Sequence, residues 1–445
     1  MVANLMRQPL LVSGLLVHAE RHHGARAIVS RLGDGTVHRC TYADLAARAR
    51  RLANALAVLG VRREDRVASL AWNGHRHLEL VHAVAGSGAV LHTLAPESGA
   101  DQVTWMLRHA SDGVLFFDLG FLPLVESVVA QGVPVRHLVA MTDRAHLPAA
   151  RGGPPLLCYE DLLAAHADRF TWPQLDEDTV ASLCYVHGDD GVPRGVVHTH
   201  RSTMLQAYAA TQPDAFDCGV ADVVLPAVPM AHGSAWGLPH VACMVGAKLV
   251  FAGPWLGGPS LCQLLDDESV TIAAALPGTW QRVLRHVGDR GLDLGRLRQV
   301  IVGGMAGMVS AEAVGPASRQ GGRLLHAWSP TRTRVAGTVC VLAPGQLVLG
   351  ADRRLAVPTQ HGHAVFGIEM KIVGEAGDEL PRDGVARGDL LVRAPWVAAG
   401  SFRGSGTPGV GWPDGWCPTG ETAAIDSHGA VHLFASAPAD RAPPP

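Results

Sequence analysis

Hydrophobic and polar residues follow helical and strand periodicities in turn along most of the chain. Between Tyr42 and Leu59 leucines recur at helical spacing, and Gly60 stands where that helix is predicted to end. A second helix is predicted at 77–85, and short apolar runs predict strands at 66–72, 89–94, 114–117, 135–141, 223–228, 248–252 and 300–302. Strands that alternate with helices form parallel sheets covered on both faces, so the pattern indicates an α/β fold.

The pattern changes near Val335, where short strand-like runs and Gly/Pro turns replace the alternation. We therefore expect α/β subdomains over 1–334 and a small β-rich lobe over 335–434. The segment 435–445 is rich in alanine and proline and buries nothing, so it is predicted to be disordered or extended.

Composition narrows the class of protein. The 445 residues are 48% hydrophobic and 17% charged, which is typical of a well-packed soluble protein with more than one lobe. The net charge of −3 and the lack of a Lys/Arg run argue against nucleic acid and anionic membranes as partners. Eight cysteines without a CxxC pair argue against a zinc site and a disulfide framework, and no apolar run is long enough to span a bilayer. These features favour a cytoplasmic protein without a metal site.

The segment from Leu183 to His200 carries the most informative motif. An apolar strand ends near His187, a turn rich in glycine follows, and a helix is predicted to begin near His200. Main-chain N–H groups in such a turn can bind an anion. Cys184 is predicted to pack inside the strand.

This turn resembles the phosphate-binding loop of the AMP-forming acyl-CoA synthetases, whose usual sequence is Ser/Thr-Gly-Thr-Thr-Gly-x-Pro-Lys-Gly-Val. Other segments resemble further motifs of that family in the same order: 228–237 the segment beside the acyl pocket, 302–304 its glycine loop, 326–332 the Trp-Gly-x-Thr-Glu segment and 415–426 the ribose-binding segment. The opening residues resemble the medium- and long-chain fatty acid branch. The resemblance implies the large N-terminal domain of the adenylate-forming fold, with two parallel-type sheets flanked by helices and a β-rich lobe.

The resemblance also implies a set of site residues. Nucleotide-binding positions would be Gly188, Gly191, Arg194, Trp328, Thr331, Arg332 and Glu421, and the acyl pocket would contain His232, Trp236, Gly303 and Gly304.

Several of these positions differ from the family pattern. Asp189 and Asp190 stand where hydroxyl residues bind phosphate, Arg194 replaces the family lysine, and Arg332 replaces the glutamate that holds Mg²⁺. A like-charge pair about 4 Å apart costs roughly 4 kcal/mol at an effective dielectric of 20. We therefore expect weak or absent binding of ATP and Mg²⁺ and no required cofactor, with AMP or CoA as remaining ligands. We further expect Asp189 or Asp190 to pair with Arg332.

The family's hinge and mobile C-terminal domain have no counterpart after Phe434, so that domain is expected to be absent. Together these departures predict a ligase-like protein that has lost ATP-dependent adenylation. As a scaffold it would bind a carboxylic acid, an acyl thioester, an acyl carrier protein or a partner enzyme, and it could form a homodimer.

Two alternatives remain open. The first is an ATP-independent enzyme that cyclises, hydrolyses or transfers an acyl or polyketide-type thioester, with His187, Asp189, Asp190 or His232 as acid or base. The second is a residual acyl-CoA ligase completed in trans by the C-terminal domain of another protein.

Overall fold

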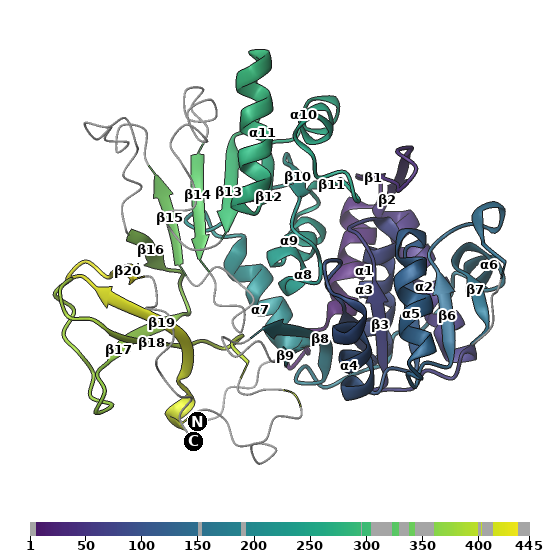
Figure 1. Ribbon diagram of the computed structural model, residues 1–445, viewed down its shortest axis with the longest axis horizontal. Helices are drawn as coiled ribbons and strands as arrows, with labels where there is room; N and C mark the ends of the chain where they lie inside the picture. The colour runs from purple at the N-terminus through teal and green to yellow at the C-terminus, as the bar shows by residue number, and fades with distance from the viewer. Residues whose placement is uncertain are drawn as a thin grey trace. The chain divides into compact units, whose positions relative to one another are not determined.

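The computed structural model describes residues 6–149, 154–187, 193–294, 296–303, 323–328, 338–342, 360–398, 402 and 413–434. The chain folds as two compact units, whose elements are labelled in Figure 1. The first unit comprises 1–208, 219–255 and 401–406, and the second comprises 209–218, 256–400 and 407–445.

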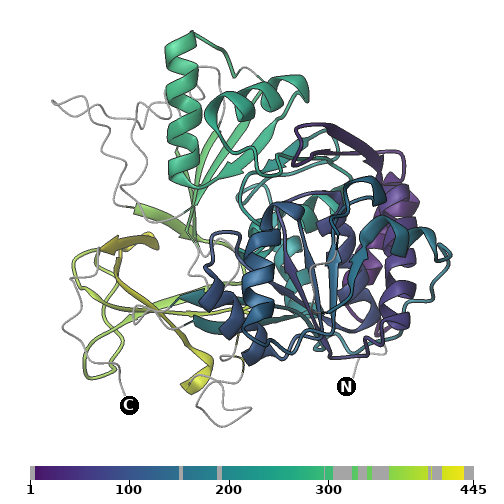
Figure 2. The ribbon, with the colours of Figure 1, turned by 45° about the vertical axis from the view of Figure 1, so that its right-hand side comes forward.

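Seven described strands of the first unit form one sheet in the order β7-β6-β5-β3-β4-β8-β9. Neighbouring strands are parallel except for the antiparallel hairpin of β8 and β9. Helices flank this sheet (Figure 2). The strands are β3 Arg66–Leu70, β4 Val90–Thr93, β5 Val114–Phe117, β6 His137–Ala140, β7 Leu156–Cys158, β8 Val180–His187 and β9 Pro193–Thr199.

A second group of strands in the same unit is β10-β11-β1-β2, with β2 antiparallel to β1 and the other pairs parallel. Its strands are β1 Ala27–Arg31, β2 Val37–Thr41, β10 Val223–Pro226 and β11 Lys248–Phe251. The α-helices up to this point are α1 Val12–His23, α2 Tyr42–Val58, α3 His75–Ser87, α4 Ala100–Ala110, α5 Leu122–Ala130, α6 Tyr159–Ala164, α7 His200–Ala210, α8 Gly233–Trp236 and α9 Leu238–Val245. Short 3₁₀ helices lie at η1 Leu119–Phe121 and η2 Arg144–His146.

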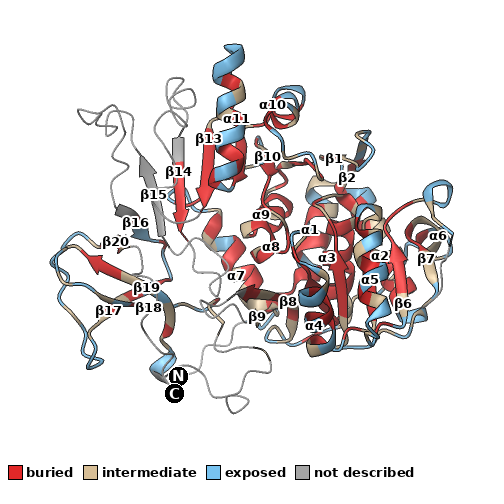
Figure 3. Ribbon diagram, viewed as in Figure 1, coloured by how far each residue is buried: buried red, intermediate tan, exposed pale blue. Residues whose placement is uncertain are grey.

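The apolar core of the first unit lies between the seven-stranded sheet and its helices (Figure 3). Leu70 of β3 and Phe117 of β5 are fully buried against Leu107 of α4 and Val128 of α5. All four residues of β4 and of β5 are buried, as expected for strands covered on both faces.

The second unit begins with the parallel strands β12 Ile272–Ala275, β13 Gln299–Gly303 and β14 Arg323–Trp328, together with helices α10 Gly258–Asp267 and α11 Pro277–Arg290. Antiparallel strands continue in the order β15-β16-β20-β19-β18-β17. They are β15 Thr338–Leu342, β16 Gln360–Ala364, β17 Glu369–Val373, β18 Gly388–Arg393, β19 Cys417–Ile425 and β20 Ala430–Phe434, with η4 at Pro413–Gly415. The predicted α/β fold with a small β-rich lobe is confirmed.

Local patterns explain why the predicted helix at Tyr42 forms where it does. Thr41 and Asp44 form a capping box: the Asp44 N–H donates to the Thr41 hydroxyl at 3.2 Å, and the Thr41 N–H donates to the Asp44 carboxylate at 2.9 Å. The helix ends before Gly60, whose φ of +77° is the left-handed conformation that favours glycine.

The domain boundary predicted at 334/335 lies outside the described residues, as does the segment 435–445, so both stay predictions. None of the helices in the described ranges combines the length and the apolar character that a bilayer span requires.

Candidate functional site

The hairpin of β8 and β9 positions the predicted phosphate loop. Its closing pair is His187 and Pro193, and the described residues include no part of 188–192 between them. Gly188, Asp189, Asp190 and Gly191 therefore lie outside the described residues, and so does the side chain of His187.

Arg194 belongs to β9, one residue after the closing pair and opposite Val186. The Arg194 guanidinium is therefore carried by the strand that follows the predicted phosphate loop. A guanidinium is always charged and offers five N–H donors in a planar fork, which suits phosphate oxygens. Arg194 therefore fits the task that the family assigns to lysine.

The next residue, Gly195, has no side chain, which leaves room for the chain at Phe402 to pass close to it. The Phe402 N–H donates to the Gly195 carbonyl at 2.8 Å, and a Cβ at position 195 would stand 2.9 Å from the Phe402 Cβ.

The predicted packing role of Cys184 is confirmed, since the residue is buried in β8. His200, at the start of α7, is buried too, and its Nδ1 accepts from the Val12 N–H at 3.2 Å.

His232 lies after β10, in the segment predicted to border the acyl pocket. Its Nε2 is 2.7 Å from a carboxylate oxygen of Glu97, and both side chains are at least one-third exposed, so solvent weakens the pair. Sequence reasoning missed Glu97, which is 135 residues away along the chain.

A left-handed turn follows His232 directly. Gly233 to Gly237 all have φ between 52° and 77°, including the non-glycine residues Ser234, Ala235 and Trp236. This conformation costs roughly 1–2 kcal/mol for each L-residue with a Cβ. The Gln206 side chain donates to the Trp236 carbonyl at 3.2 Å, and a Cβ at Gly237 would meet the same amide at 2.1 Å. Trp236 is thus presented by a strained turn that neighbouring residues hold in place.

The second unit carries the other predicted positions. Gly303 is the last residue of β13 and is buried, and Trp328 is the last residue of β14 and is only 2% exposed. Glu421 is half-buried in β19; its N–H donates to the Thr419 hydroxyl at 3.1 Å, and that hydroxyl donates to the Leu390 carbonyl at 2.9 Å. Gly304, Thr331, Arg332 and Arg334 lie outside the described residues, and with them the predicted ion pair of Arg332 with Asp189 or Asp190.

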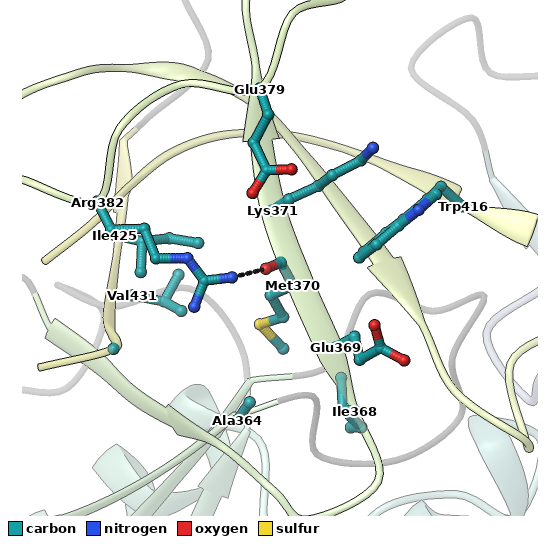
Figure 4. Close-up of a pocket in the computed structure, with 11 residues that line it drawn as sticks. Ala364, Ile368, Glu369, Met370, Lys371, Glu379, Arg382, Trp416, Ile425 and Val431 are labelled. Carbon is teal, nitrogen blue, oxygen red and sulfur yellow. Dashed lines mark hydrogen bonds between the residues drawn. The ribbon is translucent and has the colours of Figure 1, made fainter. Parts of the chain in front are cut away.

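A pocket of about 390 Å³ in the second unit contains none of the predicted site residues (Figure 4). Its wall includes Trp416, whose ring lies 4.6 Å from both the Lys371 ammonium and the Arg393 guanidinium. Arg382 donates to the Met370 carbonyl at 2.7 Å. This bond satisfies one main-chain acceptor of the edge strand β17. This pocket lies in the β-rich lobe, and Trp416 and Ile425 of its wall belong to the segment 415–426 that resembles the ribose-binding motif.

Within the described ranges, no three His, Cys, Asp or Glu side chains converge to hold a metal ion. Magnesium in nucleotide-dependent enzymes is usually held by one or two carboxylates together with the phosphates of the substrate. A preformed protein cage is therefore not needed for it.

Comparison with known proteins places the fold and the motifs in a family. The family model described as AMP-binding enzyme matches residues 15–402. The 3-methylmercaptopropionyl-CoA ligase of Ruegeria lacuscaerulensis is 40% identical over 97% of this chain and 80% of its own length. The medium-chain-fatty-acid–CoA ligase of Ectopseudomonas oleovorans is 38% identical over 97% and 79%, and the long-chain-fatty-acid–CoA ligase of Thermus thermophilus 35% over 97% and 78%.

Solved structures agree on the fold. The anthranilate CoA ligase AuaEII in complex with anthranoyl-AMP superimposes with a TM-score of 0.82 at 20% identity, over 96% of this chain and 79% of that one. The ATP-bound MatB of Rhodopseudomonas palustris gives a TM-score of 0.76 at 22% identity, over 96% and 78%.

These relatives overturn two predictions. The expected loss of ATP-dependent adenylation, with a scaffold role or ATP-independent chemistry in its place, is wrong, because chains 35–40% identical over about 97% of this one are acyl-CoA ligases. The expectation that no cofactor is required is wrong for the same reason. The side-chain charges of Asp189, Asp190 and Arg332 do not by themselves decide nucleotide binding, because main-chain N–H groups, an arginine and a divalent cation can each offset nearby carboxylates. The chain belongs to the AMP-binding enzyme family.

Proposed function

We propose that this protein is an ATP-dependent acyl-CoA ligase that joins a small apolar carboxylic acid to coenzyme A and releases AMP and pyrophosphate. The observation that supports this most strongly is its 35–40% identity, over about 97% of the chain, to ligases named for 3-methylmercaptopropionyl, medium-chain and long-chain acyl groups. His232, Trp236 and Trp328 at motif positions, together with the charge-conserving replacements Arg194 for lysine and Glu421 for aspartate, give further support.

The nucleotide would be bound by groups of three kinds. Arg194 and the main-chain N–H groups of the loop donate to the phosphate oxygens. Glu421 offers carboxylate oxygens that accept from ribose hydroxyls, and Trp328 offers an apolar wall for the adenine. Magnesium, when bound, neutralises part of the polyphosphate charge. Asp189 and Asp190 repel a bare triphosphate, and a magnesium ion bound beside the phosphates would offset that repulsion.

The acid would be bound by the segment that carries His232 and Trp236. His232 can donate to the substrate carboxylate through Nδ1 while its Nε2 contacts Glu97 at 2.7 Å, provided that both ring nitrogens carry a proton. Trp236 supplies apolar contact area for the acyl chain.

The test is product analysis with a panel of acids. The protein is incubated with ATP, Mg²⁺, CoA and one straight-chain acid from butyrate to dodecanoate, or 3-(methylthio)propionate. We expect acyl-CoA and AMP in equal amounts for at least one acid, and neither product when the acid is omitted. Failure to form acyl-CoA from any acid of the panel, or formation of ADP in place of AMP, would contradict the proposal.

Replacing Arg194 with alanine tests the nucleotide assignment. We expect kcat/KM for ATP to fall about 100-fold, because one preorganised charge on the phosphates is removed. Arg194→Lys should retain most of the activity, since the cation is kept. Arg285→Ala on the exposed face of α11 is the control. Equal kinetics for Arg194→Ala and this control would remove Arg194 from the site.

Two finer predictions concern partners. We propose that an acyl carrier protein can serve as the acceptor thiol and that the chain forms a homodimer. Replacing CoA by a carrier protein with its phosphopantetheine arm, followed by mass measurement of the carrier, tests the first. Light scattering during size-exclusion chromatography tests the second.

A further inference from the structure

We propose that Asn73 is a positioning residue for acid binding: its carboxamide fixes the segment 226–230, on which the placement of His232 and Trp236 depends. The proposal rests on the proposed function, because the affected substrate is the carboxylic acid. Asn73 itself is buried, with 6% of its surface exposed, and it lies in the loop that follows β3.

One side chain makes three hydrogen bonds to this segment. The Asn73 Nδ2 group donates to the carbonyls of Pro226 at 3.0 Å and Val228 at 2.7 Å. Its Oδ1 accepts from the Met230 N–H at 2.8 Å. A carboxamide is the one side-chain group whose single face offers two donors and an acceptor in this arrangement, so its chemistry matches the three main-chain groups.

Beyond Pro226 the segment is no longer part of a described strand, and Asn73 supplies partners to the main-chain groups of Val228 and Met230. β10 ends at Pro226, and Pro229 has no N–H to donate. Val228 and Met230 are almost fully buried, so water does not replace a lost partner of their main-chain groups.

The same residues form the base of the left-handed turn. The Met230 carbonyl accepts from the Ser234 N–H at 2.9 Å, and the Pro229 carbonyl accepts from the His232 N–H at 2.9 Å. A continuous path of hydrogen bonds therefore runs from Asn73 through Met230 to Ser234. The turn is strained, and a strained conformation persists only where its surroundings determine it.

The loop of Asn73 is itself fixed on both sides. The Trp72 N–H donates to the Asp118 carboxylate at 2.8 Å, and the His75 N–H donates to the Ser30 hydroxyl at 2.9 Å. Hydrogen bonds to the ends of β3 and β5 and to β1 thus fix the loop of Asn73. The Asn73 carboxamide in turn fixes the proposed acid-binding segment through its own hydrogen bonds.

The kinetic test compares Asn73→Asp with Asn54→Asp. Asn54, in α2, also donates its amide to two main-chain carbonyls, those of Ala167 at 2.9 Å and Arg169 at 3.0 Å, at an exposed site. Aspartate has the shape of asparagine but cannot donate to both carbonyls. For Asn73→Asp we expect the KM for the acid to rise about tenfold or more, with the KM for CoA changed by less than about twofold. Asn54→Asp should change neither.

Hydrogen exchange supplies a readout that needs no activity. In Asn73→Asp, and in Asn73→Ala if the aspartate variant does not fold, the amides of Met230 and Ser234 should exchange at least about tenfold faster while those of β5 keep the wild-type rate. Unchanged exchange at Met230 and Ser234, or a uniform acceleration with the KM values for acid and CoA rising together, would overturn the proposal. If the wild-type protein makes no acyl-CoA, the proposed function fails, and the exchange comparison still decides whether Asn73 holds this segment.

Discussion

Replacing Arg48 with alanine is expected to lower the free energy of unfolding by about 3–5 kcal/mol. The Arg48 guanidinium stands 2.6 Å from Glu79, whose side chain is completely buried, and 3.0 Å from Glu160. The Tyr159 hydroxyl donates to the other oxygen of Glu79 at 2.6 Å. Burial raises the pKa of Glu79, and Arg48 offsets that effect. Without Arg48 the carboxylate has no cation to compensate it, which is the costly case for a buried charge.

The matched control is Arg50→Ala, on the same helix. Arg50 forms two hydrogen bonds of 2.8 Å with Glu20, whose side chain is 29% exposed, so its removal should cost no more than about 1 kcal/mol. Urea unfolding followed by circular dichroism measures both. A loss for Arg48→Ala no larger than that for Arg50→Ala would show that Glu79 needs no compensating cation.

Acidification from pH 7 to pH 5 is expected to remove several kcal/mol of stability through buried histidines. Burial lowers the pKa of His77, His82 and His200 to about 4, while an unfolded histidine titrates near 6.5. The unfolded chain therefore takes up protons first, so the contribution is complete above about pH 6.5 and is lost as the pH falls toward 4. At pH 5 the loss is about 2 kcal/mol for each histidine.

Asp118 acts in the opposite direction. Burial raises its pKa to about 6, so its contribution is present below the unfolded value of 3.8 and is lost as the pH rises through 6. Acidification to pH 5 returns about 1 kcal/mol through this group, which offsets part of the histidine effect. The remainder is comparable to the whole stability of many domains.

Urea midpoints at pH 7, 6 and 5 measure this effect, with His82→Leu as the comparison. That variant lacks one buried titrating group, so its loss between pH 7 and pH 5 should be about 2 kcal/mol smaller than that of the wild type. A wild-type midpoint that does not change over this pH range would contradict the prediction.

The sequence predicted the local elements better than the non-local ones. Leucine spacing located α2, and unbroken apolar runs located β5 and β11, because these signals lie within a few residues. The pairing of β1 with β11 joins Ile28 to Leu249, and no local pattern encodes a contact over such a separation.

The residues of the candidate site show the same difference between local and non-local signals. Motif letters singled out Arg194, His232 and Glu421 as site candidates, since residue type and spacing are visible in the chain, and their roles stay predictions. Asn73, Glu97 and Gln206 were missed because their roles exist only through contacts with distant main-chain or side-chain groups. The prediction of lost ATP chemistry failed because it rested on the charges of Asp189, Asp190 and Arg332 alone, whereas relatives 35–40% identical over about 97% of the chain are acyl-CoA ligases.

We propose that the chain activates a carboxylic acid with ATP and transfers it to CoA. The most direct test of this proposal is a reaction with an acid labelled with ¹⁸O in its carboxylate, followed by mass measurement of the AMP. Attack of a carboxylate oxygen on the α-phosphorus displaces pyrophosphate, and that oxygen stays on AMP when the CoA thiol attacks the acyl carbon and releases AMP, so we expect one ¹⁸O in each AMP formed. Unlabelled AMP, or no consumption of ATP with any acid, would contradict the proposal.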